Sequence, residues 1–188
     1  ARTAQYRRTF ADPRLVRYRP RAGKVLTLAD RINECFERNL NGKPIPQDSH
    51  KLQAIVAYIE WLSKDVPTGS RMAWRGIPSL PSSKPPDPVN GAKVFTARCA
   101  FCHGADGQGT MAAPPVWGAH SYSLGSDMAR VSVAAAFIKS NMPRTRGWAL
   151  SDQDAYDVAA YINSQPRPDV AGRASDWPKG EKPSDAPH

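Results

Sequence analysis

The chain has 188 residues, of which 40% are hydrophobic and 18 are proline, and its formal net charge at pH 7 is +9. This length allows one ordinary domain or two small ones. We expect no membrane-spanning segment, because no apolar run reaches about 18 residues. The positive charge favours an anionic partner or substrate, although a merely solubilising basic surface has the same composition. Nucleic acid is not the expected partner, because no basic helix or aromatic platform for bases stands out.

Residues 1–66 are predicted to form a small helical unit. Residues 1–25 are basic and irregular. Apolar residues at helical spacing predict a helix over 26–40, with Thr27 as its N-cap and Asn41-Gly42 as its end. A second helix is predicted from the Asp48-Ser49 cap to Lys64. Its apolar face comprises Leu52, Ile55, Val56, Ile59 and Leu62. Residues 67–88, rich in Pro, Ser and Gly, are predicted to be a linker.

Residues 89–168 are predicted to form a second helical unit. Helices are expected over 89–97, over 127–140 and from 152 to 164, the last opened by Ser151 and Asp154 in a pattern that resembles a capping box. Residues 169–188 are predicted to be a polar, proline-containing tail.

Cys99, Cys102 and His103 follow the first helix of this unit as Cys99-Ala100-Phe101-Cys102-His103. This CxxCH spacing is typical of c-type haem attachment, in which both thiols form thioethers and the imidazole ligates the iron. A zinc site would need more ligands nearby, and a redox CxxC needs no histidine, so a chance dithiol is the alternative. Pro114-Pro115 and Trp117 are expected to pack at the haem edge.

Met142 is the predicted second iron ligand, thirty-nine residues after His103 and followed by Pro143. A thioether sulfur opposite an imidazole raises the potential and suits electron transfer. The alternative is that Met142 fills the core, as most methionines do. Met111, Met128 and His120 are the other candidates for this position.

The compartment follows from the haem motif. Covalent haem attachment in bacteria takes place outside the cytoplasmic membrane, so we expect a periplasmic protein. The chain shows no signal peptide and begins with Ala1 rather than Met, as a processed or trimmed chain would.

An internal repeat links the two units, because Ala57-Tyr58-Ile59-Glu60 and Ala160-Tyr161-Ile162-Asn163 lie at like positions on the closing helices. The counterpart of Cys99 in the first unit would fall just before Ala1. The counterpart of Met142 would fall at position 39, four residues from Cys35. We therefore predict an all-α fold of two tandem cytochrome c-like domains, the N-terminal one lacking a haem attachment motif in this chain.

Several blocks of the sequence, covering about residues 18–168, resemble the di-haem thiosulfate dehydrogenases. The blocks are Asp30 to Arg38, Asn41-Gly42-Lys43, Ala57 to Ser63, Cys99 to Gly109, Ala136 to Lys139, Asn141-Met142-Pro143 and Asp152 to Asn163. The resemblance implies oxidation of two thiosulfates to tetrathionate, or the reverse, with two electrons passing through two haems.

The same resemblance implies roles for individual residues. Cys35 matches the cysteine that ligates the active-site haem, and Arg21 and Arg31 match arginines that bind the anionic substrate. Cys99, Cys102, His103 and Met142 match the second, electron-transfer haem. Without the resemblance, Cys35 would be read as a small buried hydrophobe.

The sequence departs from the family in two places. Residues 1–34 hold no attachment motif, so a second haem is expected only if the chain extends upstream of Ala1, and Asn39 replaces a small hydroxyl residue. The first hypothesis is thus a periplasmic thiosulfate dehydrogenase-type oxidoreductase that reduces a redox partner protein. The alternative is a mono-haem electron carrier or a cytochrome subunit of a larger redox complex. A haem sensor with an open iron position is a third and less favoured interpretation.

Overall fold

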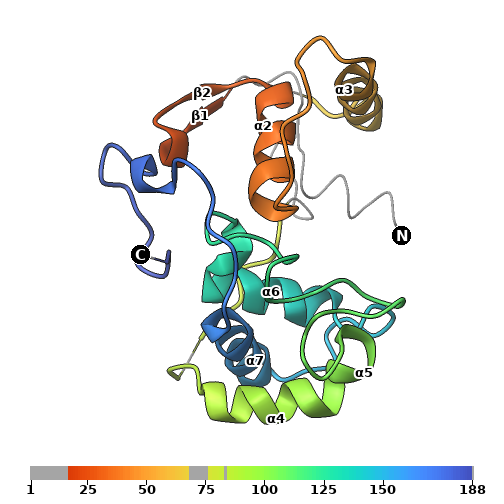
Figure 1. Cartoon of the computed structure of the whole chain (residues 1–188), viewed down its shortest axis with the longest axis vertical. Coiled ribbons are helices and arrows are strands. Elements are labelled where there is room, and N and C mark those ends of the chain that lie inside the picture. The colour runs from red at the N-terminus through yellow and green to blue at the C-terminus, as the bar shows by residue number, and fades with distance from the viewer. Residues whose placement is uncertain (1–16, 68–75, 83, 188) are drawn as a thin grey trace. The chain divides into compact units, whose positions relative to one another are not determined.

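The computed structural model describes residues 17–67, 76–82 and 84–187, and its chain divides into two compact units. The first unit comprises Ala1–Glu37, Gly42–Ile77 and Gly172–Pro183. The second comprises Arg38–Asn41, Pro78–Ala171 and Ser184–His188. Figure 1 shows that helices dominate both units. Within the described residues, no helix combines the length and the apolarity needed to cross a bilayer.

The first unit opens with a two-stranded hairpin, where the sequence predicted irregular chain. Strand β1 (Arg17–Arg19) pairs antiparallel with β2 (Lys24–Leu26), and a 3-10 turn, η1 (Pro20–Ala22), joins them. Gly23 closes the turn at φ 63°, and its N–H donates to the oxygens of Arg19 (2.9 Å) and Pro20 (3.1 Å). A glycine adopts this left-handed conformation without a Cβ clash, which is why so short a hairpin forms here. The remainder of the predicted irregular segment, residues 1–16, lies outside the described residues.

Helix α2 (Leu28–Glu34) has Thr27 as its N-cap, as predicted, but Leu26, which the predicted range included, pairs in strand β2 instead. Thr27 Oγ1 accepts the N–H of Asp30, and the Asp30 carboxylate accepts the N–H of Thr27, which makes a reciprocal capping box. The next five residues continue as the wider π-helix η2 (Cys35–Asn39). The helical path then ends, because Asn41 is left-handed at φ 50° and Gly42 N–H donates to Phe36 O at 2.8 Å.

Helix α3 (His50–Leu62) is capped by Ser49, also as predicted. Its Leu52 and Ile59 form a small core with Ile32 of α2. The loop between the two helices is fixed by Asn33, whose side chain accepts the N–H of Ile45 at 2.8 Å and donates to its oxygen at 2.9 Å. This amide pairing holds the loop against the end of α2.

The second unit is built from α4 (Pro88–Arg98), the short α5 (Ala100–His103), the 3-10 turn η3 (Asp127–Ala129), α6 (Val131–Asn141) and α7 (Asp152–Ser164). Helix α7 packs against both α4 and α6 (Figure 1). Phe95, Ala135 and Val158 lie at the centre of the core with 1%, 0% and 0% of their surfaces exposed.

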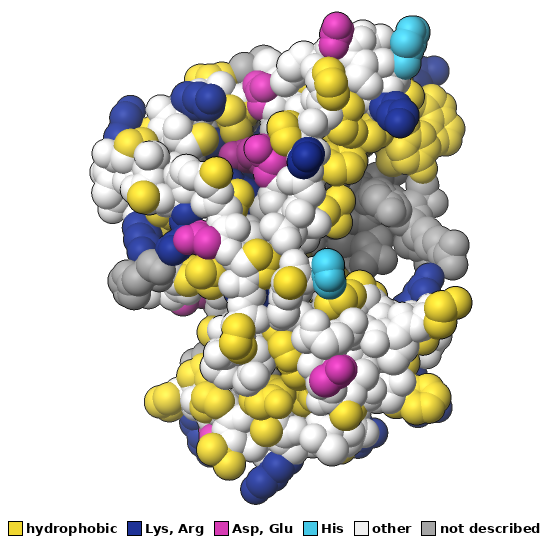
Figure 2. Space-filling model, in the orientation of Figure 1, with side chains coloured by type: hydrophobic (Ala, Val, Ile, Leu, Met, Phe, Trp, Pro, Cys, Tyr) yellow, Lys and Arg dark blue, Asp and Glu magenta, His cyan; other side chains and the backbone are white. Residues whose placement is uncertain are grey.

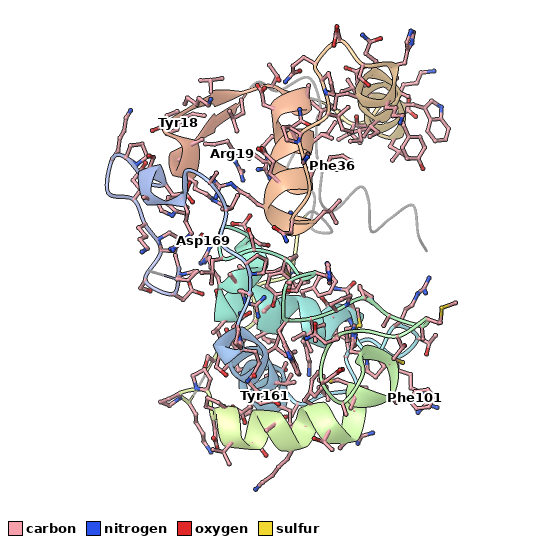
Figure 3. The ribbon with its side chains drawn as sticks, in the orientation of Figure 1. Tyr18, Arg19, Phe36, Phe101, Tyr161 and Asp169 are labelled. Atoms are coloured by element: carbon pink, nitrogen blue, oxygen red, sulfur yellow. The ribbon has the colours of Figure 1, made fainter. Side chains whose placement is uncertain are left out.

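The two closing helices pack differently, despite their matching sequence positions. Tyr161 of α7 points toward α4 (Figure 3), with its ring centroid 5.7 Å from those of Phe95 and Trp117. Tyr58 of α3 stacks instead on Trp61, and these two side chains are 51% and 66% exposed. Figure 2 shows the hydrophobic side chains gathered over α3. The aromatic face that is packed in the second unit is therefore exposed in the first.

The residues predicted as a polar tail make contacts in both units. Gly172–Pro183, which includes the 3-10 turn η4 (Arg173–Ser175), belongs to the first unit and runs beside its hairpin (Figure 1). In the second unit, Asp185 accepts from Arg130 Nε at 2.8 Å and from the Ser132 N–H at 3.2 Å. The prediction missed these contacts because they join residues far apart in the sequence.

Candidate functional site

The CxxCH segment is positioned by α4. Asp87 caps that helix by accepting the N–H of Val89, and Pro88 occupies its first turn. At its other end, Cys99 N–H donates to Phe95 O at 2.8 Å, and the N–H groups of Cys102 and His103 both donate to Cys99 O. One helical turn therefore separates the two cysteines, which places their thiols on the same side of α5.

The two thiols have different surroundings. Cys99 packs against the hydrophobic core, whereas Cys102 is exposed, and neither forms a disulfide. Burial, and secondly the neighbouring Cys102, raises the pKa of the Cys99 thiol to about 11, so this thiol is protonated at neutral pH. Phe101, between the two cysteines, lies on the outside of α5 with 94% of its surface exposed (Figure 3).

His103 is oriented by a backbone carbonyl that the sequence analysis did not identify. Its Nδ1 lies 2.8 Å from Pro114 O. Because a carbonyl only accepts, Nδ1 carries the proton, and Nε2 keeps its lone pair for a metal. The proline eleven residues after the histidine was the available signal, since proline fixes the path of the loop that presents this oxygen.

The loop that follows His103 is folded back onto it. Gly109 N–H donates to His103 O at 2.7 Å, and Thr110 Oγ1 donates to Cys102 O at 2.6 Å. Residues 108–115 line an open hollow of about 430 Å³. Trp117, predicted to lie at the haem edge, is 8% exposed, and its ring centroid is 4.8 Å from that of Phe95.

Met142 lies at the end of α6, where its N–H donates to Ile138 O at 2.8 Å. It packs against the same core as Cys99. An imidazole with a free Nε2, a thioether and two unpaired thiols in one unit form the donor set of a c-type haem, so the residues present fit that group. Among the other candidates, Met111 and His120 are exposed, and the backbone oxygen of Met128 accepts from Asn163.

In the first unit, Arg31 and Cys35 lie one turn apart on the same helical face. Cys35 N–H donates to Arg31 O, which continues the helix into η2. Arg31 also forms an ion pair with Glu34, a partner that its spacing of three residues could have indicated. Arg21 lies on a separate element, the turn η1 of the hairpin.

The segment after Cys35 joins the second unit within three residues. Arg38 O accepts from the N–H (3.0 Å) and the hydroxyl (2.9 Å) of Ser123. Asn39 Oδ1 accepts from Ser126 Oγ at 2.6 Å, and Asn41 Nδ2 donates to Ala119 O at 3.0 Å. The Asn39 amide, which departs from the family pattern, therefore has a hydrogen-bonding role here.

Two family models match the chain. Residues 10–68 match the cytochrome c domain of SoxA/TsdA, and residues 88–166 match cytochrome c. Cytochrome c domains bind haem c covalently, which agrees with the donor set of the second unit.

The curated relatives include thiosulfate dehydrogenases from Allochromatium vinosum and Psychrobacter arcticus. The first is 44% identical over 82% of this chain and 60% of its own length, and the second 41% identical over 89% and 53%. The solved structure of thiosulfate dehydrogenase (TsdBA) from Marichromatium purpuratum matches with a TM-score of 0.83 at 35% identity, over 98% of this chain and 41% of that one.

The chain thus spans about half the length of the curated relatives it matches. Similarity to these relatives covers both units. The SoxA/TsdA model matches the first half of the chain, and the cytochrome c model matches the second half. Both halves of the chain thus match cytochrome c models, and along both units the chain is similar to the thiosulfate dehydrogenases.

Proposed function

We propose that this chain takes part in the periplasmic oxidation of thiosulfate to tetrathionate. Arg21 and Arg31 bind the substrate in the first unit, Cys35 serves there as the cysteine ligand of the active-site haem, and electrons leave through the second unit. The observation that carries the proposal is the placement of Arg31 and Cys35 on one face, in a segment that becomes part of the second unit three residues later.

In the second unit, Cys99 and Cys102 would attach a haem, and His103 and Met142 would supply the ligands of its iron. When bound, this haem takes up and releases one electron at a time. The chain's own contribution is orientation, because Pro114 O holds the His103 ring and the end of α6 holds Met142 against the same core as Cys99. We place the reaction in the periplasm because bacterial c-type haems are attached there.

In the first unit, Arg21 and Arg31 would bind the thiosulfate anion. Joining two thiosulfate dianions into tetrathionate releases two electrons, and the reactants repel each other and any nearby thiolate. Guanidinium groups offset that repulsion with charge and with paired N–H donors. Cys35 would ligate the active-site haem that the resemblance implies. The CxxCH motif within residues 1–188 is the one at Cys99, which belongs to the second unit.

Replacing Cys35 by Ala tests this proposal. We expect thiosulfate to lose its ability to reduce the natural, haem-loaded protein, while dithionite still reduces the haem of the second unit. Glu37→Ala in the same π-helix is the matched control and should retain thiosulfate-dependent reduction. Undiminished reduction by thiosulfate in the Cys35→Ala protein would rule out the proposed site.

A second candidate function is electron transfer without substrate chemistry. The haem donor set of the second unit supports it, because one haem is all that such a carrier needs. The two functions are separated by thiosulfate itself. A carrier is reduced by dithionite and by a partner protein but not by thiosulfate, whatever residue stands at position 35.

A further inference from the structure

The C-terminal segment Gly172–Pro183, called the strap below, is fastened to the hairpin that carries Arg21. Trp177 N–H donates to Arg21 O at 2.8 Å. Pro178 lies against Gly23 so closely that a Cβ on that glycine would be 2.3 Å from the proline Cγ. Lys179 Nζ lies 4.9 Å from the centroid of the Tyr18 ring. Three consecutive strap residues thus contact three positions of the hairpin.

Trp177 contacts Arg21 through both its backbone and its side chain. The Arg21 guanidinium carbon lies 5.7 Å from the centroid of the Trp177 ring, within the range of a cation–π contact. Trp177 has φ 62°, a left-handed conformation that bulky residues rarely adopt and that persists only where the surroundings hold it. In this conformation the N–H and the ring of one residue both reach Arg21.

We infer that Trp177 is a positioning residue for Arg21 in anion binding, an inference that rests on the proposed function of Arg21. In a cation–π contact a guanidinium meets the ring with its face, whereas an oxyanion is bound by the in-plane N–H donors, so the two kinds of contact are compatible. The backbone hydrogen bond fixes the turn η1 beneath that side chain. Holding a long side chain in one geometry before binding reduces the entropy that the substrate must offset.

The test compares Trp177→Leu with Trp177→Phe in the natural, haem-loaded protein. Leu keeps apolar bulk but removes the ring, and we expect it to raise the KM for thiosulfate about 3- to 10-fold with kcat within about twofold. Phe keeps an aromatic face and should restore most of the affinity. If Trp177 were merely structural, its replacement would instead lower kcat and thermal stability together, and the Leu and Phe variants would have similar KM values.

Trp148→Leu is the matched control. Trp148 is also a tryptophan at positive φ (70°), and it also lies near a cation, with Lys139 Nζ 6.0 Å from its ring centroid, but it belongs to the second unit. We expect its replacement to leave the KM for thiosulfate unchanged.

The Arg21→Ala background shows whether Trp177 acts through Arg21. If it does, adding Trp177→Leu changes KM by less than about twofold, because the two effects are not additive. An unchanged KM in Trp177→Leu, or an equal rise in both backgrounds, would overturn the inference.

The inference and the proposed function can fail separately. If the wild-type protein does not oxidise thiosulfate, the proposed function fails, and calorimetric binding of thiosulfate to the oxidised protein then decides the inference. Weaker binding in Trp177→Leu than in the Trp148→Leu control supports it. Equal binding in the two variants, or no binding to the wild type, contradicts it.

Discussion

Gly91 of α4 lies directly against the backbone of Asp157 in α7. A Cβ at position 91 would be 2.0 Å from Asp157 O and 2.8 Å from the Cβ of Tyr161. The two helices therefore touch at backbone level, which only glycine allows. Because Cys99 follows about two turns later at the end of α4, this contact also fixes the direction in which α4 presents the CxxCH segment.

Gly91→Ala is expected to destabilise the second unit by about 1–3 kcal/mol, because the added methyl group forces α4 away from α7. Thermal unfolding followed by far-UV circular dichroism measures the loss. Lys93→Ala, at an exposed position of the same helix, should change stability by less than about 0.5 kcal/mol. Equal stability of the Gly91→Ala and Lys93→Ala proteins would show that the close approach is not needed.

Asp157 links α7 to the start of α4. Its carboxylate accepts from Asp87 N–H (2.8 Å), Asn90 Nδ2 (2.8 Å) and Gln153 Nε2 (2.7 Å), and only 2% of the residue is exposed. Burial by itself would raise the pKa of Asp157, but these three donors together hold it below its ordinary value of 3.8.

Stability from the charged Asp157 is therefore present above pH 3.8 and is lost as the pH falls through the lower folded-state pKa. Asp157→Asn should lower the free energy of unfolding by about 1–3 kcal/mol at pH 7. The difference in this free energy between the variant and the wild type should become smaller in acid. Urea unfolding at several pH values tests this, with exposed Asp65→Asn as control. If the difference in free energy of unfolding does not change with pH, the stabilising role of the charged Asp157 is contradicted.

Met142→Ala tests the second axial ligand. The variant should keep its haem covalently bound through Cys99 and Cys102, but its visible spectrum should change and its midpoint potential should fall, because thioether ligation favours the reduced iron. Met111→Ala is the control, since Met111 is fully exposed. If the spectrum and the potential of Met142→Ala match those of the wild type, Met142 is not the ligand.

Arg144 and Arg146 are exposed two and four residues after Met142 and should attract an anionic electron acceptor. Replacing both by Glu should slow oxidation of the reduced protein by ferricyanide about tenfold at low salt, with less effect at high salt, and should speed oxidation by a cationic cobalt complex. Stopped-flow kinetics give both rates. Lys93→Glu, on α4, is the control; an equal slowing there would indicate net charge rather than a local docking surface.

The sequence alone predicted what depends on neighbouring residues. The caps at Thr27, Ser49 and Ser151 begin their helices as predicted, because a cap is made by a side chain and an N–H within three residues of each other. The CxxCH motif is likewise local, so its residues alone are enough to predict haem attachment there.

The tertiary structure decided the contacts between distant residues. Among these are the Pro114 oxygen on His103, the strap on the hairpin and the joining of Arg38–Asn41 to the second unit. The repeat gave Tyr58 and Tyr161 the same place on their helices, yet only Tyr161 packs against a partner helix. Periodicity fixes the face on which a side chain lies, but what covers that face depends on chain far away in sequence, which no local pattern encodes.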